Sequence, residues 1–203
     1  MIRITIHPLL LVVLLSMVFT GNIALYSIIL FSLLLHELGH LLAARIVRVK
    51  VKSCVIMPYG GEIELGKQEV THLQLLIIAL GGPLATMIGM ASCMLLPPLI
   101  ATLFFQVQIY LLCVNLLPLL PLDGGKIICY ALLAIYPKTK IYERFLSFSL
   151  LLLTILVIVT LLMLPQSIVV VLYSLFLWSK VIGEWKYRKY HSAYEKIVLN
   201  RLT

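Results

Sequence analysis

Residues 31–46 read FSLLLHELGHLLAARI, an apolar run that carries two histidines and a glutamate in its middle. His36 and His40 stand four residues apart, so on an α-helix they project from one face, one turn apart. Two imidazoles in that relation can hold one zinc ion, and Glu37 beside them is a candidate general base. Ionisable residues are costly inside a membrane span, so this cluster marks a candidate functional site.

The composition requires a lipid environment. Of the 203 residues, 62% are hydrophobic, and the mean hydropathy is +1.10, whereas a soluble domain is about 45–50% apolar. The net charge of +8 comes from basic residues in short segments between hydrophobic runs. The positive-inside rule and anionic lipid explain that pattern better than nucleic acid does. No CxxC pair occurs among the four cysteines, which argues against a disulfide framework or a cysteine-zinc site.

We therefore predict an all-α polytopic membrane protein with six transmembrane helices. The apolar runs place these spans at about residues 8–20, 23–46, 72–96, 99–117, 145–164 and 167–182. A short apolar helix is expected at 127–136. The first run lacks a small-x-small cleavage site, so it is interpreted as a retained span and not as a signal peptide. Pro83 is expected to bend or interrupt the third span.

Two segments depart from this helical pattern. Residues 47–66 alternate apolar and polar side chains around a Pro-Tyr-Gly-Gly turn, which predicts a small membrane-associated β-hairpin or sheet between the second and third helices. Residues 184–203 mix aromatics with lysines and arginines, which predicts an amphipathic, basic cytoplasmic tail. The expected organisation is a six-span domain over residues 1–183 followed by this tail.

Charge also predicts the orientation. The turns near residues 21–22, 97–98 and 165–167 contain no lysine or arginine, so the other side of the membrane is cytoplasmic and holds both termini. His36 then lies roughly 20 Å into a core of about 30 Å. Asp123 follows the cytoplasmic end of the fourth span, so the histidine pair and Asp123 can meet in the inner leaflet.

Residues 115–126 read NLLPLLPLDGGK, in which Pro118 and Pro121 forbid a continuous helix. A catalytic zinc ion needs three protein ligands and an open position, and Asp123 supplies the third. The alternative is that Asp123 caps the N-terminus of the following helix. Asn115 either donates to a substrate carbonyl or satisfies backbone that is freed near Pro118. The hairpin or the 115–122 segment could hold an unwound substrate as an added strand.

Three motifs carry a resemblance to a known family: HELGH at 36–40, GGP at 81–83 and N-x-x-P-x-x-P-L-D-G-G at 115–125. Together they resemble the site-2 protease family of intramembrane zinc metallopeptidases. The IHP start at 6–8 and the hairpin after HELGH are similar to its small six-span sporulation members. The resemblance implies that His36, His40 and Asp123 bind zinc and that Glu37 is the base.

The resemblance also implies a biological setting. The expected substrate is a membrane-associated pro-sigma factor, cleaved at the forespore outer membrane facing the mother cell, with membrane inhibitor proteins that restrain cleavage. The C-terminal nucleotide-sensing domain that many sporulation members carry has no counterpart before Thr203, so ATP sensing is not implied.

Two other functions compete with an intramembrane zinc metalloendopeptidase. A membrane transporter or metal permease with a zinc site predicts polar residues spread over several spans and internal repeats, neither of which the sequence has. A catalytically silent scaffold has no need of Glu37 between two aligned histidines. The convergence of the polar residues favours the protease.

Overall fold

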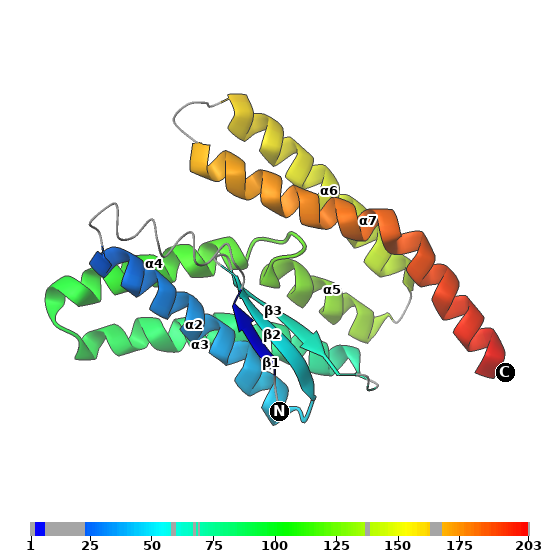
Figure 1. Cartoon of the computed structure of the whole chain (residues 1–203), viewed down its shortest axis with the longest axis horizontal. Coiled ribbons are helices and arrows are strands. Elements are labelled where there is room, and N and C mark those ends of the chain that lie inside the picture. The colour runs from blue at the N-terminus through cyan, green and yellow to red at the C-terminus, as the bar shows by residue number, and fades with distance from the viewer. Residues whose placement is uncertain are drawn as a thin grey trace. The chain divides into compact units, whose positions relative to one another are not determined.

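The computed structural model describes residues 3–6, 23–57, 60–66, 68, 70–136, 139–162 and 168–202. These residues are mostly helical, and the chain divides into two compact units, Met1–Leu117 and Pro118–Thr203 (Figure 1). The described residues contain four helices that are long and apolar enough to cross a membrane: Ile23–Ile46, His72–Leu95, Pro98–Asn115 and Lys140–Leu162. They make this an integral membrane protein. The predicted span at 8–20 lies outside the described residues, and the count of six spans stays a prediction.

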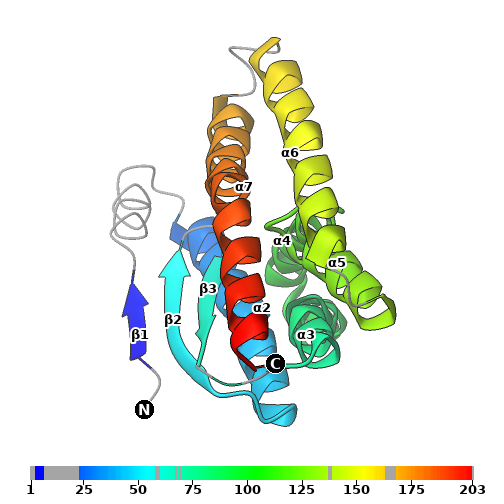
Figure 2. The same cartoon turned by 90° about the vertical axis from the view of Figure 1, so that its right-hand side faces the viewer.

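A three-stranded sheet belongs to the first unit. Strand β1 (Arg3–Ile6) pairs in parallel with β2 (Val51–Met57), which pairs antiparallel with β3 (Gly60–Leu65). Figure 2 shows the three strands side by side in this order. The sequence did not predict β1. The turn of the predicted hairpin, Pro58 and Tyr59, lies outside the described residues, so the hairpin itself stays a prediction.

Helix α2 (Ile23–Ile46) carries the HELGH motif and has the predicted bounds. It ends where Arg48 adopts a left-handed backbone with φ of 57°, and the Val49 amide then donates to the Ala44 carbonyl over 2.9 Å. This is the usual way in which a helix terminates its carbonyl ladder. Helix α3 (His72–Ser92) begins with a capping box between Thr71 and Gln74.

Helices α2 and α3 cross at two glycines. A Cβ atom on Gly39 would meet the backbone of Gly81, and a Cβ atom on Gly81 would lie 2.5 Å from the Gly39 carbonyl oxygen. Only glycine permits this approach. Helix α3 continues past Pro83 to Ser92, so the predicted interruption of the third span is wrong, while the predicted bend stays a prediction. Packing against α2 keeps the helix intact on both sides of the proline.

Helix α4 (Pro98–Asn115) belongs to the first unit and packs against both α2 and α3. It begins with a proline at its first position, where no N–H is required. Irregular turns follow it at residues 116–122, as Pro118 and Pro121 predict.

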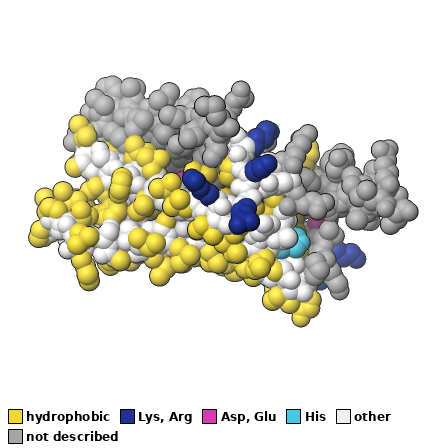
Figure 3. Space-filling model, turned by 90° about the horizontal axis from the view of Figure 1, so that it is seen from below, with side chains coloured by type: hydrophobic (Ala, Val, Ile, Leu, Met, Phe, Trp, Pro, Cys, Tyr) yellow, Lys and Arg dark blue, Asp and Glu magenta, His cyan; other side chains and the backbone are white. Residues whose placement is uncertain are grey.

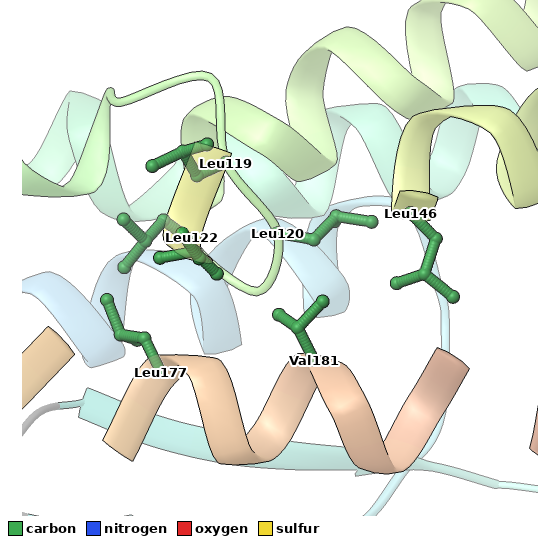
Figure 4. Close-up of a cluster of buried hydrophobic side chains, with 7 residues drawn as sticks. Leu119, Leu120, Leu122, Leu146, Leu177 and Val181 are labelled. Atoms are coloured by element: carbon green, nitrogen blue, oxygen red, sulfur yellow. The ribbon is translucent and has the colours of Figure 1, made fainter. Parts of the chain in front are cut away.

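The second unit contains α5 (Asp123–Ile135), α6 (Thr139–Leu162) and α7 (Ile168–Leu202). Helices α6 and α7 lie side by side (Figure 1). Its core combines leucines of the 119–122 turn with side chains of α6 and α7 (Figure 4): Leu119, Leu120, Leu122, Leu146, Leu153, Leu177 and Val181. Helix α7 continues through residue 183, where the sequence predicts the start of a separate tail.

Large hydrophobic side chains are exposed on every candidate membrane helix, among them Phe31, Ile88, Leu99 and Ile158. Figure 3 shows hydrophobic side chains over much of one face, with lysines and arginines gathered in a smaller area. Such a surface is unfavourable in water and favourable in lipid.

Candidate metal centre

The two histidines of HELGH are buried in the first unit. The exposed fraction is 2% for His36 and 7% for His40. Their ring centroids lie 4.9 Å apart with an interplanar angle of 83°, so one ring presents its edge to the other. The helical spacing therefore brings both imidazoles to one place, as the sequence predicts.

The ring of His36 is oriented by Thr86 on α3. The Nδ1 atom of His36 lies 2.8 Å from Thr86 Oγ1, and the Thr86 hydroxyl donates to the Gly82 carbonyl over 3.1 Å. Because that hydroxyl hydrogen is committed to Gly82, Thr86 can only accept from His36. His36 therefore carries its hydrogen on Nδ1 and its lone pair on Nε2.

The ring of His40 is oriented by the α3 backbone. Its Nδ1 atom lies 2.7 Å from the Ile78 carbonyl oxygen and 3.2 Å from the Gly82 nitrogen. The first contact needs a hydrogen on Nδ1 and the second a lone pair. We assign the hydrogen to Nδ1, because that contact is shorter and a carbonyl oxygen can only accept. This tautomer again puts the lone pair on Nε2.

The two lone pairs face each other, since the Nε2 atoms of His36 and His40 are 3.3 Å apart. Two lone pairs at that distance repel, and a cation between them removes the repulsion. Zinc–nitrogen bonds of about 2.0–2.1 Å at a tetrahedral angle put two nitrogens roughly 3.3 Å apart. Ligating histidines also donate their other N–H to a protein acceptor, as both do here. The pair therefore fits a zinc ion.

Gly82 leaves space beside these nitrogens. A Cβ atom on Gly82 would touch His40 Nε2 and would lie 2.6 Å from His36 Nε2. Any side chain at this position would thus occupy the side of the imidazoles that carries the lone pairs. The middle glycine of GGP keeps that space open.

Glu37 follows His36 on α2 and is buried, with 7% of its surface exposed. A carboxylate in such surroundings is shielded from bulk water, which strengthens its interactions with nearby charge. The general-base role of Glu37 stays a prediction.

Asp123 is the first residue of α5 in the second unit and is 4% exposed. Leu122 is the N-cap of this helix, and no side chain caps it, so the predicted alternative role of Asp123 as N-cap is wrong. The helix N-terminus nevertheless favours its negative charge. Lys126 forms an ion pair with Asp123 Oδ1 at 3.4 Å, and its side chain is 38% exposed.

Asn115 is the last residue of α4 and is 9% exposed. Its Nδ2 atom donates to the Leu111 carbonyl over 3.1 Å, within its own helix. A carboxamide has two N–H bonds, so this contact uses one of them.

The sequence did not identify Thr86 or the Ile78 carbonyl as parts of the site, and Gly82 was noted only within the GGP motif at 81–83. Thr86 carried a usable signal, because it is a polar residue in an apolar span and lies one helical turn after Gly82. The Ile78 carbonyl carried none, since every residue has one.

The chain is similar to known metalloproteases. Residues 24–100 match the family model of peptidase family M50. The chain is 29% identical over 209 residues to stage IV sporulation protein FB of Bacillus subtilis (strain 168), which covers 98% of this chain and 71% of that protein. It is 31% identical over 119 residues to a zinc metalloprotease of Methanocaldococcus jannaschii, of which it spans 33%.

A solved structure is also similar. The site-2 protease from Methanocaldococcus jannaschii superposes with a TM-score of 0.69 at 26% sequence identity, over 90% of each chain. The similarity therefore extends well beyond the helices that hold the HELGH and GGP motifs.

Proposed function

We propose that this chain, which carries a peptidase family M50 domain of the site-2 protease type, hydrolyses peptide bonds of membrane-associated proteins with one zinc ion. The observation that carries this proposal is the buried imidazole pair, whose Nε2 atoms are 3.3 Å apart while both Nδ1 atoms are held by α3. Asp123, which is also buried, is the proposed third ligand of that ion.

The chemistry follows from these residues. Zinc, when bound, supplies the Lewis acidity that peptide hydrolysis requires. Glu37 takes a proton from the attacking water and later gives it to the leaving amine, as a general base and then a general acid. Asn115 uses its second N–H to stabilise the negative charge that develops on the substrate carbonyl oxygen.

The substrate is a membrane-associated protein that is cleaved near the cytoplasmic side. The relative from Bacillus subtilis is named for sporulation, and this supports a pro-sigma factor as substrate and membrane inhibitor proteins as regulators. The substrate chain unwinds and pairs with an edge of the sheet or with residues 115–122, because peptide bonds inside a helix are protected by its hydrogen bonds.

The membrane arrangement we propose has six spans and both termini in the cytoplasm. The absence of lysine and arginine from residues 21–22, 97–98 and 165–167, between the proposed spans, supports it. The domain then covers residues 1–183, and the basic tail at 184–203 lies on anionic lipid. In a sporulating cell this places the enzyme in the forespore outer membrane, facing the mother cell.

The test is cleavage of a membrane-tethered candidate substrate by the reconstituted protein. The wild type should release a product that disappears with a zinc chelator and returns when zinc is restored. Glu37→Gln should keep its zinc and lose the product. Full cleavage by zinc-loaded Glu37→Gln would refute the general-base role, and chelator-resistant cleavage would refute the zinc mechanism.

A further inference from the structure

The turn that precedes Asp123 is held by a polar contact from a helix that supplies no metal ligand. The backbone N–H of Leu120 donates to Ser149 Oγ of α6 over 3.1 Å. Ser149 is fully buried, with an exposed fraction of 0%. Leu120 stands three residues before Asp123, so this contact acts on the backbone that leads directly into the proposed ligand.

Backbone hydrogen bonds within the same segment also stabilise the turn. The Leu122 amide donates to the Leu119 carbonyl over 2.9 Å, and the Lys126 amide donates to the Leu122 carbonyl over 3.1 Å. A Cβ atom on Gly125 would lie 2.6 Å from both the Leu119 oxygen and the Leu120 nitrogen. The first turn of α5 therefore packs directly on the backbone of residues 119–120, so a shift of that backbone would displace the start of α5.

The turn also makes apolar contacts with α6 and α7. Leu119, Leu120 and Leu122 pack among side chains of α6 and α7 (Figure 4). Hydrophobic contact stabilises burial, but it is not directional and tolerates small shifts. A hydrogen bond has narrow limits of distance and angle. The Ser149–Leu120 bond is thus the contact from α6 that fixes where the turn sits along that helix.

We propose that Ser149 is a positioning residue for Asp123: by fixing the Leu120 backbone on α6, it fixes the place of the Asp123 carboxylate. This inference rests on the proposed function, in which Asp123 is a zinc ligand. Removal of the Ser149 hydroxyl leaves the buried Leu120 N–H without its acceptor. The turn then shifts, because a new position can give that N–H another partner. Asp123 then moves with it.

The experiment compares Ser149→Ala with Ser174→Ala in the full-length reconstituted protein. Ser174 is the matched control, because it is also a buried serine in the α6–α7 pair, with 1% exposed. Its hydroxyl contacts Thr160 Oγ1 at 3.2 Å and the Val171 carbonyl at 2.9 Å, both outside the 119–122 turn. Both variants remove one hydroxyl from the same helix pair.

Ser149→Ala should bind zinc on the order of tenfold more weakly, as is common when support for a metal ligand is lost. With Co²⁺ in place of zinc, its visible absorption spectrum should change, since that spectrum reports ligand geometry. The kcat value should fall with KM unchanged. Ser174→Ala should match the wild type in zinc affinity and in the Co²⁺ spectrum.

Wild-type affinity and spectrum in Ser149→Ala would overturn the inference, and so would equal losses in both serine variants. Asp123→Ala separates this failure from failure of the proposed function. If Asp123→Ala loses zinc while Ser149→Ala does not, the positioning role is wrong and Asp123 is still a ligand. If Asp123→Ala itself binds zinc normally, the proposed ligand set is wrong.

Discussion

Thr86 on α3 accepts a hydrogen bond from the Nδ1 atom of His36 over 2.8 Å and donates a hydrogen bond to the Gly82 carbonyl. One hydroxyl thereby fixes the tautomer and the plane of an imidazole on the neighbouring helix. Partners of this kind orient metal ligands and raise their basicity.

Removal of that hydroxyl should weaken zinc binding. Thr86→Val keeps the β-branched shape and loses the hydrogen bond, so we expect zinc affinity to fall by about 10–100-fold. Competition with a chromophoric chelator measures this. Thr86→Ser retains the hydroxyl and should stay within a few-fold of wild type. An unchanged affinity in Thr86→Val would contradict the orienting role.

A side chain at Gly82 should block the metal centre. In Gly82→Ala the new Cβ atom would lie 2.6 Å from His36 Nε2 and would touch His40, so we expect zinc content and cleavage to be lost. Gly183→Ala is the matched control, because nothing lies within 4 Å of a Cβ atom built there. Measurement of the zinc content of both purified variants tests this expectation. Stoichiometric zinc in Gly82→Ala would show that the imidazoles bind the ion from another side.

Asp123→Ala should lose zinc without losing α5. Because Leu122 and not Asp123 is the N-cap, the helix loses only a favourable charge at its first turn, worth about 0.3–1 kcal/mol. Circular dichroism and metal content measure the two effects separately. Lys126→Ala, which removes the half-exposed partner in the ion pair, should keep its zinc. If Asp123→Ala lost helix but kept its zinc, Asp123 would be a helix cap and not a zinc ligand.

Substitution of Gln108 on α4 by an apolar residue should stabilise the folded protein. Gln108 is fully buried, its Nε2 donates to Ser32 Oγ over 3.3 Å, and its Oε1 has no hydrogen-bond partner among the described residues. Gln108→Met keeps the unbranched shape and removes a buried acceptor, whose desolvation costs about 1–3 kcal/mol. Thermal unfolding in detergent should occur at the same temperature or higher. A clear decrease would mean that Oε1 has a partner in the membrane.

The parts of the fold set by local pattern were predictable. The bounds of α2 follow from an apolar run between Gly21-Asn22, where the sequence predicts a turn, and the basic segment after Ile46. The irregular turns after Asn115 follow from two prolines that cannot join a helix. The placement of His36 and His40 on one face needs only the helical period.

The parts that depend on a distant neighbour were not predictable. Strand β1 exists because Arg3–Ile6 pairs in parallel with residues about fifty positions later, and a four-residue strand has no period of its own. Pro83 was expected to bend or interrupt its helix, and the helix is not interrupted, because packing against α2 outweighs one missing hydrogen bond. The acceptors of the two histidines are known only once α3 is seen beside α2.

The glycine crossing of α2 and α3 has a thermodynamic consequence. Gly39 and Gly81 bring the two backbones together, and α3 then holds both imidazoles through Thr86 and the Ile78 carbonyl. The two imidazoles therefore lose their rotamer entropy when the helices assemble, and not when zinc binds. A zinc finger does the reverse and folds only around its metal. In this chain we expect the helices and both imidazoles to assemble without zinc, so that removal of the ion leaves the fold intact.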